Sequence, residues 1–463
     1  MDTSNITNTS DQYMKKNQRS KEFYRQAKEV MPGGVTANIK YFDPYPIIMN
    51  KGKGAYLYDL DGNEYIDYLL SYGALMLGHG HPDVIQAIQT QIDEDGTFLF
   101  GTPHRLEIEM GKKIQQLYPS MELIRYTNSG TEATLLAIRM AYAYTGKHKV
   151  AKFEGHYHGG YEQVLLSVNP SIHEAGPEHQ PNAVIESKGV DPYHEEHTVI
   201  LPFNNLDATA EILTKRKDEI AAVILEPIQG GYIPAEQSFM DGLRKITDQL
   251  GILLIYDEVK TGFRLGLGGA QSVYQIKPDL TTLGKVVGGG FPIGIIGGKK
   301  DILEVSAPKA SSDVFDSSQS KQSSAKEVLF HSGTYNGHPT ILAAGLATIK
   351  HLEQEIDHVL AVTDQLKEGI CNLFKKRGIA MQTVGLGSIF NVVITEKDKI
   401  LNYRDMQQSN FALRKELDFQ LLAEGVYTKP LNRYSLSTVH GETEVNRTLE
   451  SYDKVLANLE RIY

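Results

Sequence analysis

The sequence predicts an α/β protein built around a mostly parallel sheet with helices on its faces, plus a smaller α+β domain. Short apolar runs, each suited to a strand buried on both faces, recur through the middle of the chain: ELIRYTN, KVAKFEG, AAVILEP and ILLIYDEV. Helical patterns such as HPDVIQAIQTQIDEDG and TEATLLAIRMAYAYTG alternate with these runs, which favours parallel strands joined by helices. A length of 463 residues allows two or three domains.

The elements flanking this middle part have recognisable ends. SKEFYRQAKEVMPGG reads as a short helix that ends at Pro32 and two glycines. GAYLYDLDGNEYIDY reads as a hairpin that turns at Asp61 and Gly62. HPTILAAGLATIKHLEQEI reads as a long helix.

These patterns divide the chain into four parts. The polar residues 1–20 are expected to be a disordered tail, and residues 21–75 an N-terminal arm that joins the small domain. Residues 76–337 form the predicted large α/β domain, in which the serine-rich segment 306–327 is a surface insertion. Residues 338–463, opened by the long helix, complete the predicted small domain.

Composition narrows the class of protein. With 47 basic and 57 acidic residues the net charge is -10, which argues against nucleic acid or an anionic membrane as the main partner. The single cysteine, Cys371, allows neither a disulfide framework nor a cysteine metal site. The polar start lacks the apolar stretch of a signal peptide, so a cytoplasmic protein is expected.

Residues directly after the apolar runs are the candidates for chemistry, because ligands of parallel sheets gather beyond the carboxyl ends of the strands. After ELIRY come Ser129, Gly130 and Thr131, which open a helix. Their hydroxyls and backbone N–H groups suit a phosphate, or Ser129 or Thr131 simply caps the helix.

The next two strand ends carry a carboxylate and an amine. Asp257 directly follows the apolar run ILLIY, so its carboxylate is expected to be buried. A buried carboxylate must be stabilised by a cation or by hydrogen-bond donors. Such a residue has either a structural or a functional role. Lys285 ends the run PDLTTLG and precedes a glycine cluster. It is either a strand-end lysine that reaches solvent or a desolvated amine that attacks aldehydes. Val286 disfavours a Walker-type loop, which needs Ser or Thr after the lysine.

An anion cradle, a buried carboxylate and an amine at neighbouring strand ends together match one cofactor. Pyridoxal phosphate requires a phosphate site, a partner for its ring nitrogen and a lysine for a Schiff base. The three sites therefore predict a pyridoxal-phosphate enzyme, with Lys285 holding the aldehyde.

The chain also resembles a known family from about Phe23 onwards. The motifs TNSGTEA, FEGHYHGG, AAVILEPIQGG, LLIYDEVKTGFR, PDLTTLGKVVGGGFPIG and GTYNGHP are similar in order and spacing to those of class III aminotransferases. They resemble most the glutamate-1-semialdehyde 2,1-aminomutase branch. The resemblance implies the fold-type I architecture of these pyridoxal-phosphate enzymes and a homodimer with shared active sites.

The resemblance also implies roles for single residues. Lys285 forms the Schiff base and shuttles a proton, and Asp257 pairs with the ring nitrogen. Val259 and Tyr157 pack on the two ring faces. The phosphate is held by Ser129, Gly130 and Thr131, joined by Thr334 of the partner subunit. No metal is expected, although His156 and His158 flank Tyr157.

Three departures from the mutase pattern bear on the substrate. Lys40 stands where the mutases have an arginine, Tyr72 where they have a tryptophan, and Arg433 where they have an acidic segment. An arginine there suits the carboxylate of glutamate or 2-oxoglutarate, so the expected activity is amino transfer between an amino acid, including β- or ω-amino compounds, and an oxo acid or aldehyde. The alternatives are the intramolecular mutase and, more remotely, a non-catalytic protein that binds pyridoxal phosphate.

Overall fold

The computed structural model describes residues 11–309 and 327–459, so most of the predicted insertion at 306–327 lies outside the described residues. The chain folds as two compact units. Unit 1 comprises residues 1–82, 354–398 and 408–463, and unit 2 comprises residues 83–353 and 399–407.

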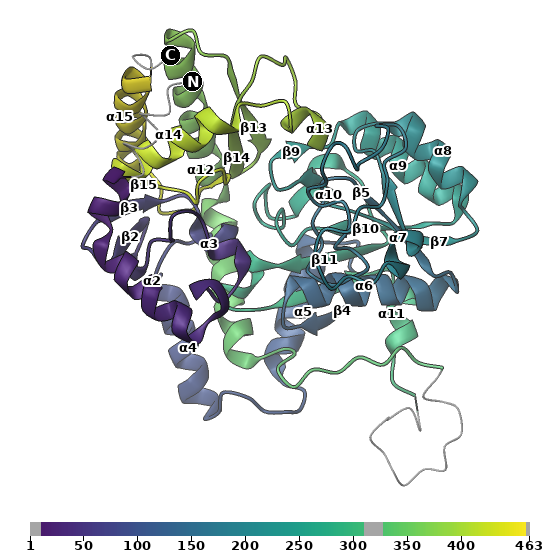
Figure 1. Cartoon of the computed structure of the whole chain (residues 1–463). Coiled ribbons are helices and arrows are strands. Elements are labelled where there is room, and N and C mark those ends of the chain that lie inside the picture. The colour runs from purple at the N-terminus through teal and green to yellow at the C-terminus, as the bar shows by residue number, and fades with distance from the viewer. Residues whose placement is uncertain (1–10, 310–326, 460–463) are drawn as a thin grey trace. The chain divides into compact units, whose positions relative to one another are not determined.

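Unit 2 is built on a seven-stranded sheet (Figure 1). In spatial order its strands are β4 (Leu123–Thr127), β12 (Gly294–Gly298), β11 (Leu280–Gly284), β10 (Leu253–Asp257), β7 (Ile220–Leu225), β5 (Lys149–Phe153) and β6 (Thr198–Leu201). Strand β12 is antiparallel to both of its neighbours, and the ladders from β11 to β6 are parallel. The prediction of a mostly parallel sheet is confirmed, and the four apolar runs are β4, β5, β7 and β10.

Helices pack on this sheet because its strands are apolar on both faces. All six residues of β7 are buried, and helix α6 (Gly130–Thr145) buries Leu136, Ala137 and Met140 in the same core cluster as β7. The other helices of unit 2 are α4 (Pro82–Asp95), α5 (Arg105–Leu117), α7 (Tyr193–His197), α8 (Leu206–Lys215), α9 (Gln237–Leu250), α10 (Gly269–Tyr274), α11 (Lys300–Leu303) and α13 (Tyr403–Met406). Short strands β8 (Ile228–Gln229) and β9 (Ile233–Pro234) pair with each other.

Unit 1 holds two smaller sheets. In spatial order, the strands of the first sheet are β1 (Met49–Lys53), β2 (Tyr56–Asp59), β3 (Glu64–Asp67) and β15 (Val426–Tyr427). Those of the second sheet are β13 (Met381–Leu386), β14 (Ile389–Ile394) and β16 (Tyr434–Ser435). The predicted hairpin is β2 and β3, with Gly62 at φ +90° in the turn. The helices of unit 1 are α2 (Gln18–Val30), the short α3 (Leu70–Gly73), α14 (Phe411–Ala423) and α15 (Glu442–Leu459). The long helix α12 (Pro339–Lys376) contributes residues to both units.

Residues 11–20, expected in a disordered tail, are largely helical. Tyr13 is buried against Phe42, Tyr45 and Phe419, and its hydroxyl donates a hydrogen bond of 2.6 Å to the Tyr45 carbonyl. The tail prediction is wrong for these ten residues because one buried aromatic side chain anchors an otherwise polar segment.

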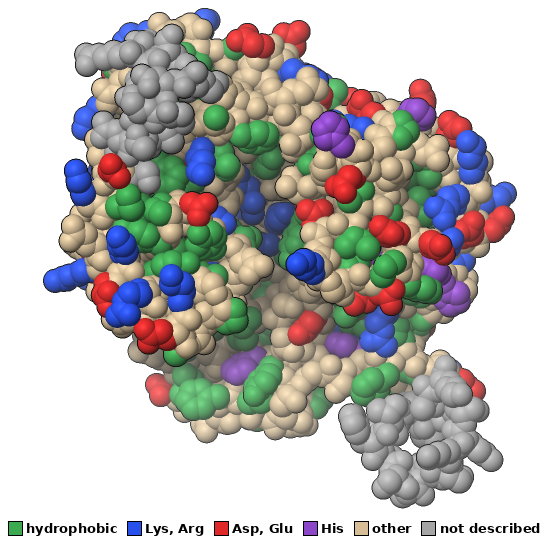
Figure 2. All heavy atoms as spheres, viewed as in Figure 1, with side chains coloured by type: hydrophobic (Ala, Val, Ile, Leu, Met, Phe, Trp, Pro, Cys, Tyr) green, Lys and Arg blue, Asp and Glu red, His purple; other side chains and the backbone are tan. Residues whose placement is uncertain are grey.

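The surface carries both acidic and basic side chains (Figure 2), as the composition of 47 basic and 57 acidic residues predicts. Acidic and basic side chains are interspersed over the face of the molecule that Figure 2 shows. Within residues 11–309 and 327–459, no helix is both long and apolar enough to cross a membrane.

Candidate active site

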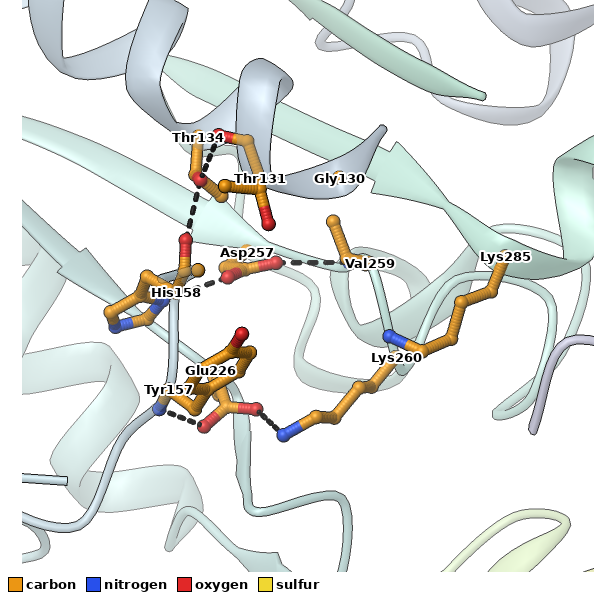
Figure 3. A pocket seen from close by; sticks show the side chains of 11 residues that line it. Gly130, Thr131, Thr134, Tyr157, His158, Glu226, Asp257, Val259, Lys260 and Lys285 are labelled. Carbon is orange, nitrogen blue, oxygen red and sulfur yellow. Dashed lines mark hydrogen bonds and ion pairs between the residues drawn. The ribbon is translucent and has the colours of Figure 1, made fainter. Parts of the chain in front are cut away.

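The candidate site is a pocket of about 250 Å³ in unit 2, at the edge where the parallel strands end (Figure 3). Asp257 ends β10, Glu226 follows β7, and Lys285 follows β11. The lining residues come from these strand ends, from the start of α6 and from the loop after β5: Gly130, Thr131, Thr134, Tyr157, His158, Gly159, Glu226, Asp257, Val259, Lys260 and Lys285. The sheet therefore brings together six of the residues proposed from the sequence.

The first residues of α6 have two roles: one caps the helix, and the next two line the pocket. Ser129 is the N-cap, and its Oγ accepts a hydrogen bond of 3.1 Å from the Glu132 N–H, while the Glu132 carboxylate accepts one of 2.7 Å from the Asn128 N–H. Gly130 and Thr131 line the pocket instead. Ser129 thus takes the capping role, while the next two residues offer N–H groups and a hydroxyl at the positive end of the helix dipole.

Two glycines let the walls of the pocket approach each other closely. A Cβ on Gly130 would lie 2.6 Å from a methyl carbon of Val259. A Cβ on Gly159, whose φ is +121°, would lie 2.8 Å from the Thr131 methyl carbon. Larger residues at either position would push these walls apart.

Asp257 is buried with its charge satisfied by three donors. Its Oδ2 lies 2.7 Å from Nδ1 of His158, and its Oδ1 accepts bonds from the Val259 N–H at 3.1 Å and the Thr282 hydroxyl at 3.3 Å. The His158 carbonyl in turn accepts a bond of 2.6 Å from the Thr134 hydroxyl. The carboxylate is therefore held in one orientation toward the pocket, with hydrogen bonds that offset the cost of burial.

Lys285 is placed by a strained backbone position. Its φ is +50°, in the left-handed region that residues with a Cβ seldom adopt, at the junction of β11 and the 3-10 turn Lys285–Gly288. Such a position costs on the order of 1–3 kcal/mol. The side chain runs into the pocket (Figure 3).

An ion pair between Lys260 and Glu226, which was not predicted from the sequence, lines the pocket. The Lys260 amine lies 2.6 Å from Oε1 of Glu226, whose side chain is 2% exposed. Burial raises the pKa of Glu226, but Lys260, foremost among the groups that lower it, and the nearby His156 and His158 together bring the pKa to about 2. The signal was present, because Glu226 follows the apolar run of β7 just as Asp257 follows that of β10.

Tyr157 connects this pair to the rest of the site. Its N–H donates a hydrogen bond of 2.9 Å to Oε2 of Glu226, and the Lys260 amine lies 5.6 Å from the centre of its ring. Of the flanking histidines, His156 accepts a bond of 3.0 Å from the Glu226 N–H at Nδ1, and burial holds its pKa well below 6.5. Both histidines thus use Nδ1 to hold the site's acidic residues in place.

The remaining predicted residues lie outside this pocket's walls. Thr334 is an exposed residue of unit 2, before α12. Lys40, Tyr72 and Arg433 all belong to unit 1. There the Tyr72 hydroxyl donates a bond of 2.8 Å to the Ile39 carbonyl. Burial raises the pKa of Tyr72, while the charge of Arg433 lowers it. The Ile39 carbonyl also accepts a bond from the Lys429 amine, which brings the segment before Arg433 to the same place.

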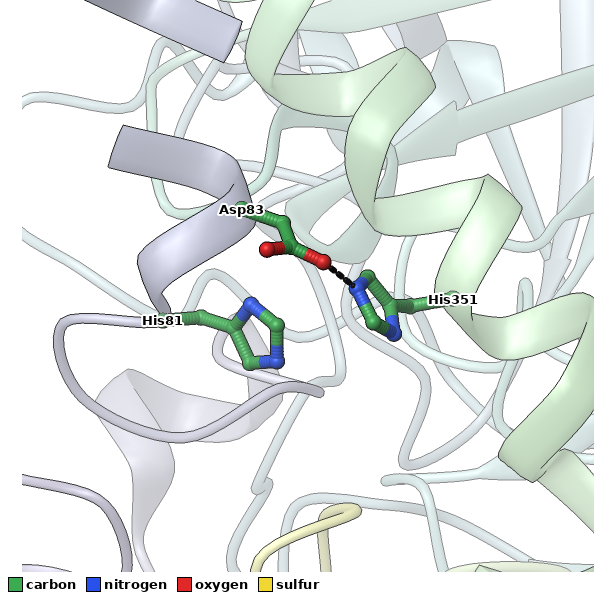
Figure 4. A group of neighbouring side chains, drawn as sticks. All are labelled: His81, Asp83 and His351. Atoms are coloured by element: carbon green, nitrogen blue, oxygen red, sulfur yellow. Dashed lines mark hydrogen bonds and ion pairs between the residues drawn. The ribbon is translucent and has the colours of Figure 1, made fainter. Parts of the chain in front are cut away.

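A second cluster of polar side chains lies at the start of α4 (Figure 4). His351 of α12 forms an ion pair with Asp83 in the first turn of α4, and both residues belong to unit 2. The contact joins the two helices, and a carboxylate in the first turn also suits the helix dipole. We assign this pair a structural role.

The chain matches proteins of one family along most of its length. The family model for class III aminotransferases matches residues 40–440. A glutamate-1-semialdehyde 2,1-aminomutase of Ignicoccus hospitalis is 39% identical over 449 residues, which cover 95% of this chain and 99% of that protein. Among solved structures, an omega-transaminase from Sphaerobacter thermophilus is similar with a TM-score of 0.88 and 33% identity, covering 96% and 98% of the two chains. A beta-phenylalanine aminotransferase from Variovorax paradoxus is similar with a TM-score of 0.82 and 29% identity, and the match covers 98% of this chain and 97% of that chain.

The Glu226–Lys260 pair predicts a pH-dependent contribution to stability. The folded pKa of Glu226 is lowered from 4.5 to about 2, so its stabilisation is present above pH 4.5 and is lost as the pH falls toward 2. The lost stabilisation is about 3 kcal/mol. The melting temperatures of wild type and Glu226→Gln, measured by calorimetry across this range, should converge as the pH falls. A constant difference would contradict the assigned pairing.

Proposed function

Because the chain belongs to the class III aminotransferases, we propose that it transfers an amino group between an amino acid and an oxo acid or aldehyde, with pyridoxal phosphate as its cofactor. One observation carries this proposal. Asp257, Lys285 and the first residues of α6 lie in a single pocket of unit 2, on the sheet expected of fold-type I enzymes.

The pocket residues fit the three functional groups of the cofactor. The start of α6, with Gly130 and Thr131, suits the phosphate, and the close approach at Gly130 and Gly159 shapes that cradle. The carboxylate of Asp257 suits the ring nitrogen. The amine of Lys285 suits the aldehyde, and the side chains of Val259 and Tyr157 suit the two faces of a flat ring.

When bound, the cofactor withdraws electrons from the substrate carbon that loses its proton. Asp257 keeps the proton on the ring nitrogen, which makes that withdrawal effective, and His158 fixes the orientation of Asp257. Lys285 would accept the proton from the substrate carbon and return it to the carbon on the other side of the nitrogen that joins substrate and cofactor. Val259 and Tyr157 pack on the ring and keep it aligned with the Lys285 amine.

We assign the recognition of the substrate carboxylate to unit 1. A guanidinium binds a carboxylate with two parallel hydrogen bonds, so Arg433 is the main candidate, and Lys40 and Tyr72 lie on neighbouring segments. The solved omega-transaminase and beta-phenylalanine aminotransferase support β- or ω-amino compounds as partners of the exchange.

A second candidate is an intramolecular exchange on glutamate 1-semialdehyde. The names of the curated relatives favour it, since the proteins from Ignicoccus hospitalis and Legionella pneumophila (strain Lens), 39% and 38% identical, are both glutamate-1-semialdehyde 2,1-aminomutases. Both candidates use the same cofactor residues and differ in whether an oxo acid leaves the enzyme.

Addition of L-glutamate separates these two candidates. If the chain is an intermolecular aminotransferase, titrating L-glutamate into the cofactor-loaded protein removes the visible absorbance band and releases one equivalent of 2-oxoglutarate per site. Arg433→Ala should weaken this reaction at least tenfold, because a carboxylate partner is lost. An unchanged spectrum, together with turnover of glutamate 1-semialdehyde to the isomer aminated at carbon 1, would overturn the first candidate in favour of the second.

A homodimer is the assembly that we propose. Phe98, Ile108 and Tyr335 are each at least 60% exposed. The segments that carry them meet where Nε2 of His104 lies 2.7 Å from the Gly337 carbonyl oxygen. Exposed apolar side chains on these joined segments support association with a second copy, in which Thr334 would reach the partner's phosphate site. A cytoplasmic location also remains a prediction.

Mixed dimers test whether Thr334 acts in the partner's site. Lys285→Ala homodimers should be inactive, and Thr334→Asp homodimers should bind the cofactor at least tenfold more weakly, because a carboxylate repels phosphate. Purified dimers with one subunit of each kind should recover one functional site of two, since one pocket then combines an intact Lys285 with an intact Thr334. Ser332→Asp, another exposed position nearby, is the control. Inactive mixed dimers would show that Thr334 acts within its own subunit.

A further inference from the structure

Lys260 is a second amine in the pocket, and the roles assigned above leave it unused. It lines the pocket together with Lys285, and it follows Asp257 and Val259 on the loop after β10. Glu226 accepts one hydrogen bond from it at 2.6 Å, and the ring of Tyr157 lies 5.6 Å from its nitrogen. The amine is therefore held in place on two sides, while it remains part of the pocket wall.

The place of Lys260 relative to the other anchors is informative. In Figure 3 the start of α6, with Gly130 and Thr131, lies on one side of Asp257, and the Glu226–Lys260 pair lies on the opposite side. Lys285 enters between these two sides. Around its wall the pocket thus presents, in order, the anion cradle, the amine of Lys285, the ion-paired amine of Lys260 and the carboxylate of Asp257.

The constitution of pyridoxal phosphate matches this order. The ring nitrogen lies opposite the carbon that bears the aldehyde. That carbon is flanked on one side by the carbon bearing the phosphate arm and on the other by the carbon bearing a phenol oxygen. With the phosphate at α6, the nitrogen at Asp257 and the aldehyde at Lys285, the phenol oxygen faces the side of the pocket formed by Glu226 and Lys260.

We propose that Lys260 binds the phenol oxygen of the cofactor as a cation, and that it thereby lowers the pH at which the linkage between Lys285 and the cofactor loses its proton. This inference rests on the proposed function. A positive charge beside the phenol oxygen stabilises its deprotonated form and competes with the proton of the linkage for it.

The charged and titratable groups around Lys260 are consistent with this role. Those facing it from the packed elements are Glu226 after β7, Tyr157, His156 and His158 from the loop after β5, Asp257 at the end of β10, and Lys285 after β11. Glu226 is the group in direct contact, and burial keeps His156 neutral.

The test is a pH titration of the visible absorbance of the cofactor-loaded protein, which reports the linkage without requiring turnover. In Lys260→Met the midpoint should rise by about one pH unit or more, because a neighbouring cation is lost. Lys300→Met removes a lysine that is 66% exposed, and its midpoint should equal that of wild type. An unchanged midpoint in Lys260→Met would overturn the proposal.

A double variant excludes a purely structural role. If Lys260 only neutralises Glu226, the Glu226→Gln/Lys260→Met protein should return to the wild-type midpoint, since the net charge of the pair is zero in both proteins. If Lys260 binds the phenol oxygen, the double variant should keep the raised midpoint, and Glu226→Gln alone should fall below wild type. A wild-type protein that forms no visible band with pyridoxal phosphate would instead overturn the proposed function itself.

Discussion

The buried carboxylate of Asp257 is the interaction on which the candidate site depends. It lies at the end of β10, the central strand of the seven-stranded sheet, and three donors from three segments converge on it. Each donor also positions a wall of the pocket. His158 brings the loop after β5, Val259 brings the loop toward Gly130, and Thr282 ties β11, which carries Lys285, to β10. One buried charge thus aligns the elements that hold the cofactor in the proposed function.

Around this carboxylate, charge is balanced locally. Glu226 would be costly to bury alone, and Lys260 offsets that cost at a distance of 2.6 Å. The Lys260 amine therefore neutralises Glu226 and also lines the pocket, where a cation can act on a bound anion. The left-handed backbone at Lys285 is a second destabilising feature of the same pocket, and it orients the second lysine that lines this pocket among the described residues.

The sequence predicts the large sheet well because its strands are buried on both faces and carry continuous apolar runs. The rule that ligands gather after parallel strands locates Asp257, Lys285, Gly130 and Thr131. Glu226, which follows β7, satisfies the same rule but was not among the predicted residues. The helical segment around Tyr13 was missed for a physical reason, since burial of one tyrosine against Phe419, distant in the chain, is invisible to local pattern. The capping bond of Ser129, by contrast, is established only by the hydrogen-bond geometry.

The central claim is that Asp257 keeps a proton on the ring nitrogen of the cofactor. The direct measurement is the ¹⁵N chemical shift of pyridoxal phosphate labelled at that nitrogen, bound to wild type and to Asp257→Asn at neutral pH. We expect the shift of a protonated pyridine in wild type and that of an unprotonated pyridine in the variant, because an amide cannot stabilise the ring cation. The same shift in both proteins would contradict the account.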